Sequence, residues 1–121
     1  MKVSIPLNPV SKPRMVQSDK WKKRPATEKY WKFKDDINKL VRGDLGSQFD
    51  IDFYVSMPKS WSKKKKAEYD GKPHQQRPDI DNFLKSFMDS LCEDDSHVWD
   101  VHPRKFWAYE GRIELTERWN R

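Results

Sequence analysis

The segment RPDIDNFLKSFMD, at residues 77–89, carries closely spaced groups that could do chemistry. Asp79 and Asp81 are two residues apart, so in an extended lead-in to a helix they point the same way. Asp81, Lys85 and Asp89 are spaced four residues apart, so on a helix they share one face. That face is distinct from the apolar stripe of the same helix. It can therefore face outward while the helix packs against a core.

More acids follow this segment, and together they suggest a metal site. Residues 79–100 contain seven acids and one base, Lys85, and the acids include the pair Asp94 and Asp95. If folding brings that pair to the start of the helix, the site has three or four carboxylates. Such hard oxygen ligands suit Mg²⁺ or Mn²⁺. The ion can activate water and polarise a phosphodiester, and Lys85 can contact the phosphate.

The same residues also have an ordinary structural interpretation. Asp79 or Asp81 can cap a helix N-terminus, where an acid is also favoured by the helix dipole. Asp81 with Lys85 is a common helical ion pair, and Asp94 with Asp95 can be turn residues. From the residues alone, the metal site and the structural role both stay open.

Composition favours a small folded domain with a polyanionic partner. The chain has 121 residues, of which 36% are charged and 35% hydrophobic, but six Trp, four Tyr and six Phe can bury large apolar areas. Residues 1–78 hold 19 bases and 9 acids, whereas residues 79–121 hold 6 bases and 10 acids. A basic chain with an acidic island predicts a polyanion for the bases and a cation for the island.

Several classes of protein are excluded. The single Cys92 leaves no internal disulfide and no multi-cysteine metal site. No apolar run approaches the length that crosses a membrane, and residues 1–9 lack the apolar region of a signal peptide. We therefore expect a cytoplasmic protein that does not bind membranes.

The elements that must position the acids can be predicted from hydrophobic periodicity. Val3 to Leu7 alternates as an edge strand because Pro6 cannot donate to a ladder, and Thr27 can cap a helix over 28–42. Strict alternation predicts a strand over 49–55. A helix is clear over 79–91, strands follow at 97–108 and 111–119, and 59–77 is either a short helix or a loop. The order β-α-β-α-β-β predicts a small single α+β (mixed α/β) domain over 1–121.

Several segments of the sequence resemble those of a known family. RPDIDNFLKSFMDSL at 77–91, followed by DDSHV at 94–98, resembles the RusA family of Holliday junction resolvases. PVSKPR at 9–14 is similar to the basic motif after the first strand of the family, and GRIELT at 111–116 fits its last strand. The resemblance spans nearly the whole chain, and 77–98 is its most specific part.

The resemblance implies a homodimeric, Mg²⁺-dependent endonuclease, with Mn²⁺ as a substitute, in a bacterial cell or phage-infected host. Such enzymes act in DNA recombination and repair by nicking a four-way junction symmetrically. By motif, Asp79, Asp81 and Asp95 would be the catalytic metal ligands, Lys85 the essential lysine, and Asp94 a further metal ligand. The connection after the helix is shortened to Cys92 and Glu93, which leaves Asp94 or Glu93 as alternatives to Asp95.

Basic residues in the first part of the chain are expected to bind DNA phosphates in a salt-dependent way. They are Lys12, Arg14, Lys20, Lys22, Lys23, Arg24 and Arg77. For the run Lys63–Lys66 a solvated charged turn is the favoured interpretation. Two alternative functions remain: a non-catalytic module that binds branched DNA, and a nuclease of the same fold that acts on other branched or flapped DNA.

Overall fold

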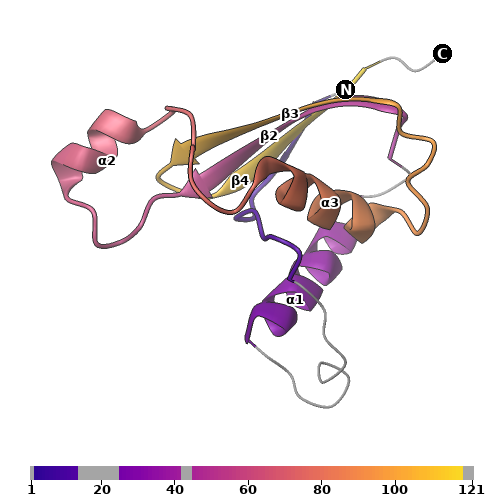
Figure 1. The fold of residues 1–121 in the computed structure, drawn as a ribbon, viewed down its shortest axis with the longest axis horizontal. Helices are drawn as coiled ribbons and strands as arrows, with labels where there is room; N and C mark the ends of the chain where they lie inside the picture. The colour runs from indigo at the N-terminus through magenta and orange to yellow at the C-terminus, as the bar shows by residue number, and fades with distance from the viewer. Residues whose placement is uncertain (1, 14–24, 42–44, 119–121) are drawn as a thin grey trace.

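The computed structural model describes residues 2–13, 25–41 and 45–118 (Figure 1). The elements are β1 (Lys2–Ile5), α1 (Pro25–Leu40), β2 (Gln48–Ser56), α2 (Lys63–Tyr69), α3 (Ile80–Leu91), β3 (Asp100–Ala108) and β4 (Arg112–Glu117). The α+β class and the element order are confirmed, and the segment between β2 and α3 contains a short helix rather than only a loop.

The four strands form one mixed sheet in the order β1-β4-β2-β3. β1 and β4 are antiparallel, β4 and β2 are antiparallel, and β2 and β3 are parallel. β1 is an edge strand, as Pro6 predicts. The consecutive strands β3 and β4 are not neighbours, because β2 lies between them.

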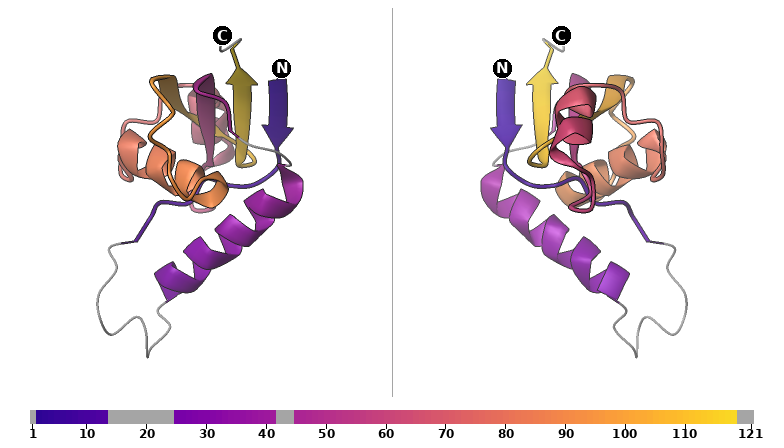
Figure 2. Two further views of the ribbon diagram at one scale, coloured as in Figure 1. Left: turned by 90° about the vertical axis from the view of Figure 1, so that its right-hand side faces the viewer. Right: turned by 90° about the vertical axis from the view of Figure 1, so that its left-hand side faces the viewer.

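The core lies on one face of the sheet. Alternate β2 residues Phe49, Ile51 and Phe53 are buried, and Ile51 and Phe53 lie in register with the buried Leu115 and Ile113 of β4. α1 and α3 cover this face and pack against each other, with α1 running obliquely away from the sheet (Figure 2). The intervening β2 residues point to the other face, as the two-residue period of a strand requires.

The start of α1 differs from the prediction. Thr27 was expected to cap a helix from residue 28, but the helix begins at Pro25 and Thr27 lies in its first turn with a buried side chain. Proline suits the first helical position because its fixed φ is already helical and it has no N–H to leave unpaired. In the described part of the chain, no helix is both long and apolar enough to span a membrane.

The turn between β3 and β4 packs closely against the chain that follows β1. A Cβ on Gly111 would lie 2.6 Å from the backbone Cα of Asn8. The Asn8 side-chain oxygen accepts a hydrogen bond from the Ser56 backbone N–H at 3.1 Å. Asn8 therefore joins the end of β2 to the β3–β4 turn, and glycine leaves the space that this contact needs.

Candidate active site

The apolar stripe of α3 packs into the core, so the charged face of the helix points outward, as the sequence predicts. Phe83, Ser86, Phe87 and Ser90 are buried, and the ring centroids of Phe83 and Phe53 are 5.4 Å apart. The other face carries Asp81, Lys85 and Asp89. The helix thus presents its charged groups on the outside of a fixed element.

A lysine on β3 fixes the chain just before α3. The Lys105 ammonium donates hydrogen bonds of 2.8 Å to the carbonyls of Gln76 and Pro78. The Arg77–Pro78 peptide bond between these carbonyls is cis. Burial lowers the pKa of Lys105, and the nearby charge of Asp79 opposes that effect. Lys105 therefore ties the lead-in to α3, and with it Asp79, to the sheet.

Lys105 was not predicted as a site residue, although the alternation of side chains along β3 carries a signal for it. Strand alternation places Val101, Pro103, Lys105 and Trp107 on the same face of β3, and the register puts Lys105 beside buried Phe53. A lysine among apolar residues on a core-facing row needs a polar partner. The partners are backbone carbonyls, which leave no mark in the sequence.

The two acids at the start of α3 are exposed and are not used by the helix. Asp79 occupies the N-cap position, but its side chain makes no capping hydrogen bond. Asp81 lies in the first turn, and no ion pair within 4.0 Å joins it to Lys85 in the described structure. The structural explanations for these residues, a side-chain cap and a helical ion pair, therefore do not account for them. Their carboxylate oxygens and the Lys85 ammonium are open to a ligand.

Asp89 and Asn82 hold the basic segment that follows β1. The Lys12 ammonium lies 2.7 Å from a carboxylate oxygen of Asp89, and the Lys12 backbone N–H donates to the Asn82 side-chain oxygen at 3.0 Å. Asn82 and Asp89 are seven residues apart and so lie on one side of α3. The ion pair raises the pKa of Lys12, although burial opposes it. Lys12, expected to contact DNA, is thus placed as an anchor of its own segment.

Asp94 and Asp95 follow the other end of α3. A twelve-residue helix is about 18 Å long, and only Cys92 and Glu93 separate it from these acids. One Asp94 oxygen accepts the Ser96 backbone N–H at 2.9 Å, which lowers the pKa of Asp94. The half-buried Asp95 makes no side-chain hydrogen bond with any residue that the structure describes. Across the residues that the structure describes, no three acids, histidines or cysteines gather closely enough to hold an ion.

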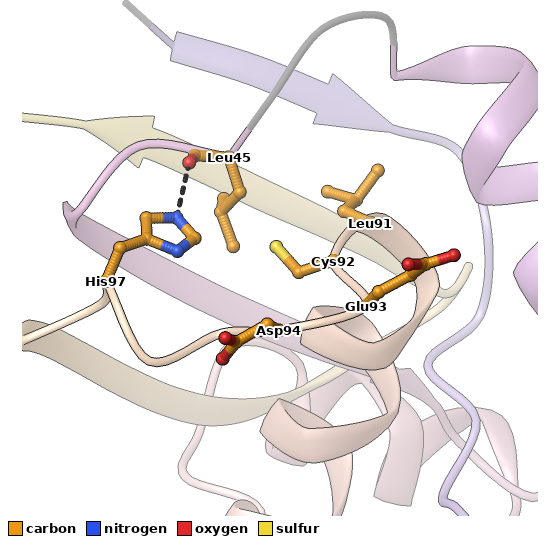
Figure 3. Close-up of a pocket in the computed structure, with 6 residues that line it drawn as sticks. All are labelled: Leu45, Leu91, Cys92, Glu93, Asp94 and His97. Carbon is orange, nitrogen blue, oxygen red and sulfur yellow. Dashed lines mark hydrogen bonds between the residues drawn. The ribbon is translucent and has the colours of Figure 1, made fainter.

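The connection after α3 borders a small pocket. The cavity of about 400 Å³ is lined by Leu45, Leu91, Cys92, Glu93, Asp94 and His97. Figure 3 shows the carboxylates of Glu93 and Asp94 turned away from each other, while the His97 ring meets the Leu45 carbonyl oxygen at 2.9 Å. The exposed His97 thus fastens this connection to the chain before β2.

The acidic island divides into engaged and unengaged carboxylates. Asp89 pairs with Lys12, Asp94 accepts from its own turn, and Asp100 pairs with Arg118 at 2.6 Å. Within residues 79–100, all of them described, the remaining acids make no hydrogen bond or ion pair with their side chains. These are Asp79, Asp81, Glu93 and Asp95.

Acids elsewhere on the sheet are already paired. Asp52 of β2 makes two hydrogen bonds of 2.8 and 2.9 Å with the guanidinium of Arg104. Asp50 lies 3.1 Å from Arg118. These acids are on the face of the sheet opposite the core, so they do not add ligands to the start of α3.

Most of the expected DNA-binding residues fall outside the described structure. Arg14, Lys20, Lys22, Lys23 and Arg24 lie there. Arg77 is described, exposed and two residues before Asp79. It is therefore the one described member of the set, apart from Lys12, that lies beside the acids of α3.

Comparison with known proteins shows to which family this chain belongs. A family model described as endodeoxyribonuclease RusA matches residues 6–116. The chain belongs to the RusA family. The match includes both halves of the site, namely the acids of α3 and those after its C-terminus. RusA resolvases act on DNA and in general depend on a divalent metal.

A curated relative adds similarity without adding an activity. The uncharacterized protein YqaN of Bacillus subtilis (strain 168) is 39% identical over 77 residues, which is 57% of this RusA-family chain. The match covers 54% of that protein, so the chain spans about half the length of this relative. What the present chain cuts and binds must therefore be argued from its own site.

Proposed function

We propose that this protein is a divalent-metal-dependent endodeoxyribonuclease that resolves four-way DNA junctions. The observation that carries the proposal is that Asp79 and Asp81 are exposed, close in sequence at a fixed helix start, and free of the cap and the ion pair that would explain them structurally. They fit Mg²⁺, which is commonly held by one or two carboxylates together with waters and substrate phosphate.

Each residue of the site then has a definite task. Asp79 and Asp81 hold the ion. Asp95 is the third proposed ligand, with Glu93 or Asp94 as the alternatives, and each of these requires a rearrangement because they follow the far end of α3. The bound ion supplies charge stabilisation to the phosphodiester and a water of lowered pKa. Lys85, one turn beyond Asp81, places its ammonium where negative charge develops on the phosphate.

The protein also has to hold a branched polyanion in a symmetric way. We assign phosphate contacts to Arg77 and to the basic residues between Lys12 and the start of α1. These are Arg14, Lys20, Lys22, Lys23 and Arg24. Paired cuts in a substrate with pseudo-two-fold symmetry are most simply made by two sites related by one two-fold axis. The proposal therefore includes a homodimer, in DNA recombination and repair.

The test is cleavage of an end-labelled synthetic four-way junction with and without Mg²⁺, next to a linear duplex. We expect paired nicks confined to the junction. Asp81→Asn should lower the cleavage rate on the order of a thousandfold while junction binding is kept or improved, because a negative charge is removed. Asp35→Asn, an exposed acid of α1, is the matched control and should cleave normally. Normal cleavage by Asp81→Asn would show that the assigned site is wrong.

The third ligand is tested separately, with variants of the two neighbouring acids. Asp95→Asn should reduce metal-dependent cleavage more than Asp94→Asn, because the carboxylate of Asp94 is already engaged by the Ser96 N–H. The reverse order would assign the role to Asp94. Equal, normal activity of both would move it to Glu93.

A second candidate function is a non-catalytic module that binds branched DNA, or a nuclease for other branched or flapped DNA. The observation that favours the binding module is that Asp95 follows the far end of α3 and, among the described residues, does not gather with Asp79 and Asp81 into a group that could hold an ion. Junction binding without nicks in either Mg²⁺ or Mn²⁺ would support it. A metal site should also raise Tm with increasing ion concentration, whereas a binding module without a site should not respond.

A further inference from the structure

The segment between β2 and α3 forms a basic arm, of which the proposed site uses only Arg77. Residues 58–77 hold seven bases and two acids, a net charge of +5. None of the residues of α2 is buried, and α2 projects beyond the end of the sheet at the left of Figure 1. We define residues 58–77 as the basic arm.

The basic arm is anchored to β3 at both ends by backbone hydrogen bonds. Before α2, the Met57 N–H donates to the Ala108 carbonyl at 2.9 Å. After α2, the Gly71 N–H donates to the Trp107 carbonyl, the Trp107 N–H donates to the Lys72 carbonyl, and the His74 N–H donates to the Lys105 carbonyl, at 2.9 to 3.0 Å. These bonds fix where the arm leaves the sheet and where it returns.

An aromatic cluster holds the body of the basic arm. The Trp61 ring centroid lies 4.8 Å from that of Trp107 and 5.3 Å from that of Tyr69, and the His74 ring is 4.3 Å from Trp107. Burial, and then the charge of Lys105, lower the pKa of His74 below its usual 6.5, so this ring is neutral near pH 7. A positioned surface binds a partner with less loss of conformational entropy than a loose loop.

The lysines of the basic arm divide into two groups. Lys65 lies 4.1 Å from the Trp61 ring centroid, and Lys72 lies 5.4 Å from that of Tyr69, so both ammonium groups cover the aromatic cluster. Lys59, Lys63 and Lys64 are exposed and Lys66 is half-buried, and in the described structure none of these four makes an ion pair or ring contact. Lys63 and Lys64 are the adjacent exposed pair at the start of α2. Lys63 and Lys64 therefore have no structural role in the described structure and are available to bind a polyanion.

The position of the arm relates it to the proposed site. Residues 70–79 connect α2 to α3, and the N-terminus of α3 is the end of that helix nearer to α2 (Figure 1). Duplex DNA carries one negative charge per about 1.7 Å of its axis, so a cut strand brings many phosphates past this end. Resting on the proposed function, we propose that Lys63 and Lys64 bind backbone phosphates of a duplex arm that flanks the cut, without reading its sequence.

The experiment compares two variants that lose the same charge. Lys63→Gln/Lys64→Gln removes the proposed contacts, and Lys29→Gln/Lys39→Gln removes two exposed lysines of α1. The Kd for a four-way junction is measured without divalent ions over a range of salt. Each phosphate contact contributes about 0.9 to the slope of log K against log salt, so the arm variant should lose about 1.8. At 0.1 M salt its affinity should fall on the order of tenfold to fiftyfold.

The outcomes separate this proposal from the proposed function. The α1 variant should keep more of its affinity and slope than the arm variant, and Lys63→Arg/Lys64→Arg should bind as the wild type does. At saturating enzyme, the single-turnover cleavage rate of the arm variant should stay within about twofold of the wild type. Equal losses of junction affinity in the arm and α1 variants, or no loss in the arm variant, would overturn the proposal for the basic arm and leave the proposed function standing. Failure of the wild-type protein to bind the junction at all would overturn both proposals.

Discussion

The ion pair between Lys12 and Asp89 offers a quantitative test of how the basic segment is held. The two residues are 77 positions apart in the chain, and their side chains are 30% and 26% exposed. At 2.7 Å the contact is a charge-assisted hydrogen bond, whereas a fully exposed pair contributes little. With that solvent screening taken into account, we expect a coupling free energy of about 1 kcal/mol.

The measurement is a double-mutant cycle of chemical unfolding with Lys12→Met, Asp89→Asn and the double variant. Each single variant should lower Tm by about 3 to 6 °C, and the double variant by less than the sum. The swapped variant Lys12→Asp/Asp89→Lys should recover part of the loss. A coupling free energy near zero, with no recovery on swapping, would refute the structural role of the pair.

The pH dependence of this coupling has a definite sign. The pair raises the pKa of Lys12 above its ordinary value of 10.5. The stability that it brings is therefore fully present below about pH 10.5 and is lost as the pH rises through the raised pKa. A coupling free energy that grew at alkaline pH would contradict this assignment.

The same variants show what Lys12 does in DNA binding. If Lys12 anchors its segment, Lys12→Met and Asp89→Asn should both weaken junction binding through a loosened segment and leave the salt slope nearly unchanged. If Lys12 instead neutralises a phosphate, its loss should lower the slope by about 0.9, and Asp89→Asn should strengthen binding. The second pattern would return Lys12 to the set of direct DNA contacts.

Two further predictions concern the elements that position the site. Lys105→Met leaves the carbonyls before Asp79 without their donor and should cost about 1–3 kcal/mol of stability; at a temperature well below its Tm it should also lower kcat, and an unchanged kcat would refute the positioning role. Gly111→Ala places a Cβ 2.6 Å from the Asn8 backbone and should cost about 1–3 kcal/mol, measured by urea unfolding, with cleavage kept at low temperature. An unaltered urea midpoint would show that Asn8 can move without cost.

Local patterns predicted the elements of the fold well. The alternation of Phe49, Ile51 and Phe53 predicted β2, and the apolar stripe through Phe83 and Phe87 predicted α3 and the outward direction of its acids. These predictions succeed because the period of side-chain burial is a property of each element by itself. The start of α1 was wrong because two N-terminal signals, Pro25 and Thr27, compete within three residues.

The arrangement of the strands could not be predicted in the same way. The turn at Gly111 shows that β3 and β4 follow each other closely, but it does not show that β4 lies between β1 and β2. Strand order depends on which faces are buried together and on how the helices cover the sheet. These contacts involve segments from the whole chain, so the local spacing of apolar residues does not predict them.

The sequence by itself determined which residues form the candidate site: the motif at 77–91 with the acids after it, and the family to which they belong. Only the tertiary structure decided how those charges are used. It paired Asp89 with Lys12 and Asp100 with Arg118, bound the loop before Asp79 to Lys105, and left Asp79 and Asp81 exposed. The physical reason is that a motif fixes the type and local spacing of charges, whereas their partners come from segments that only folding brings close.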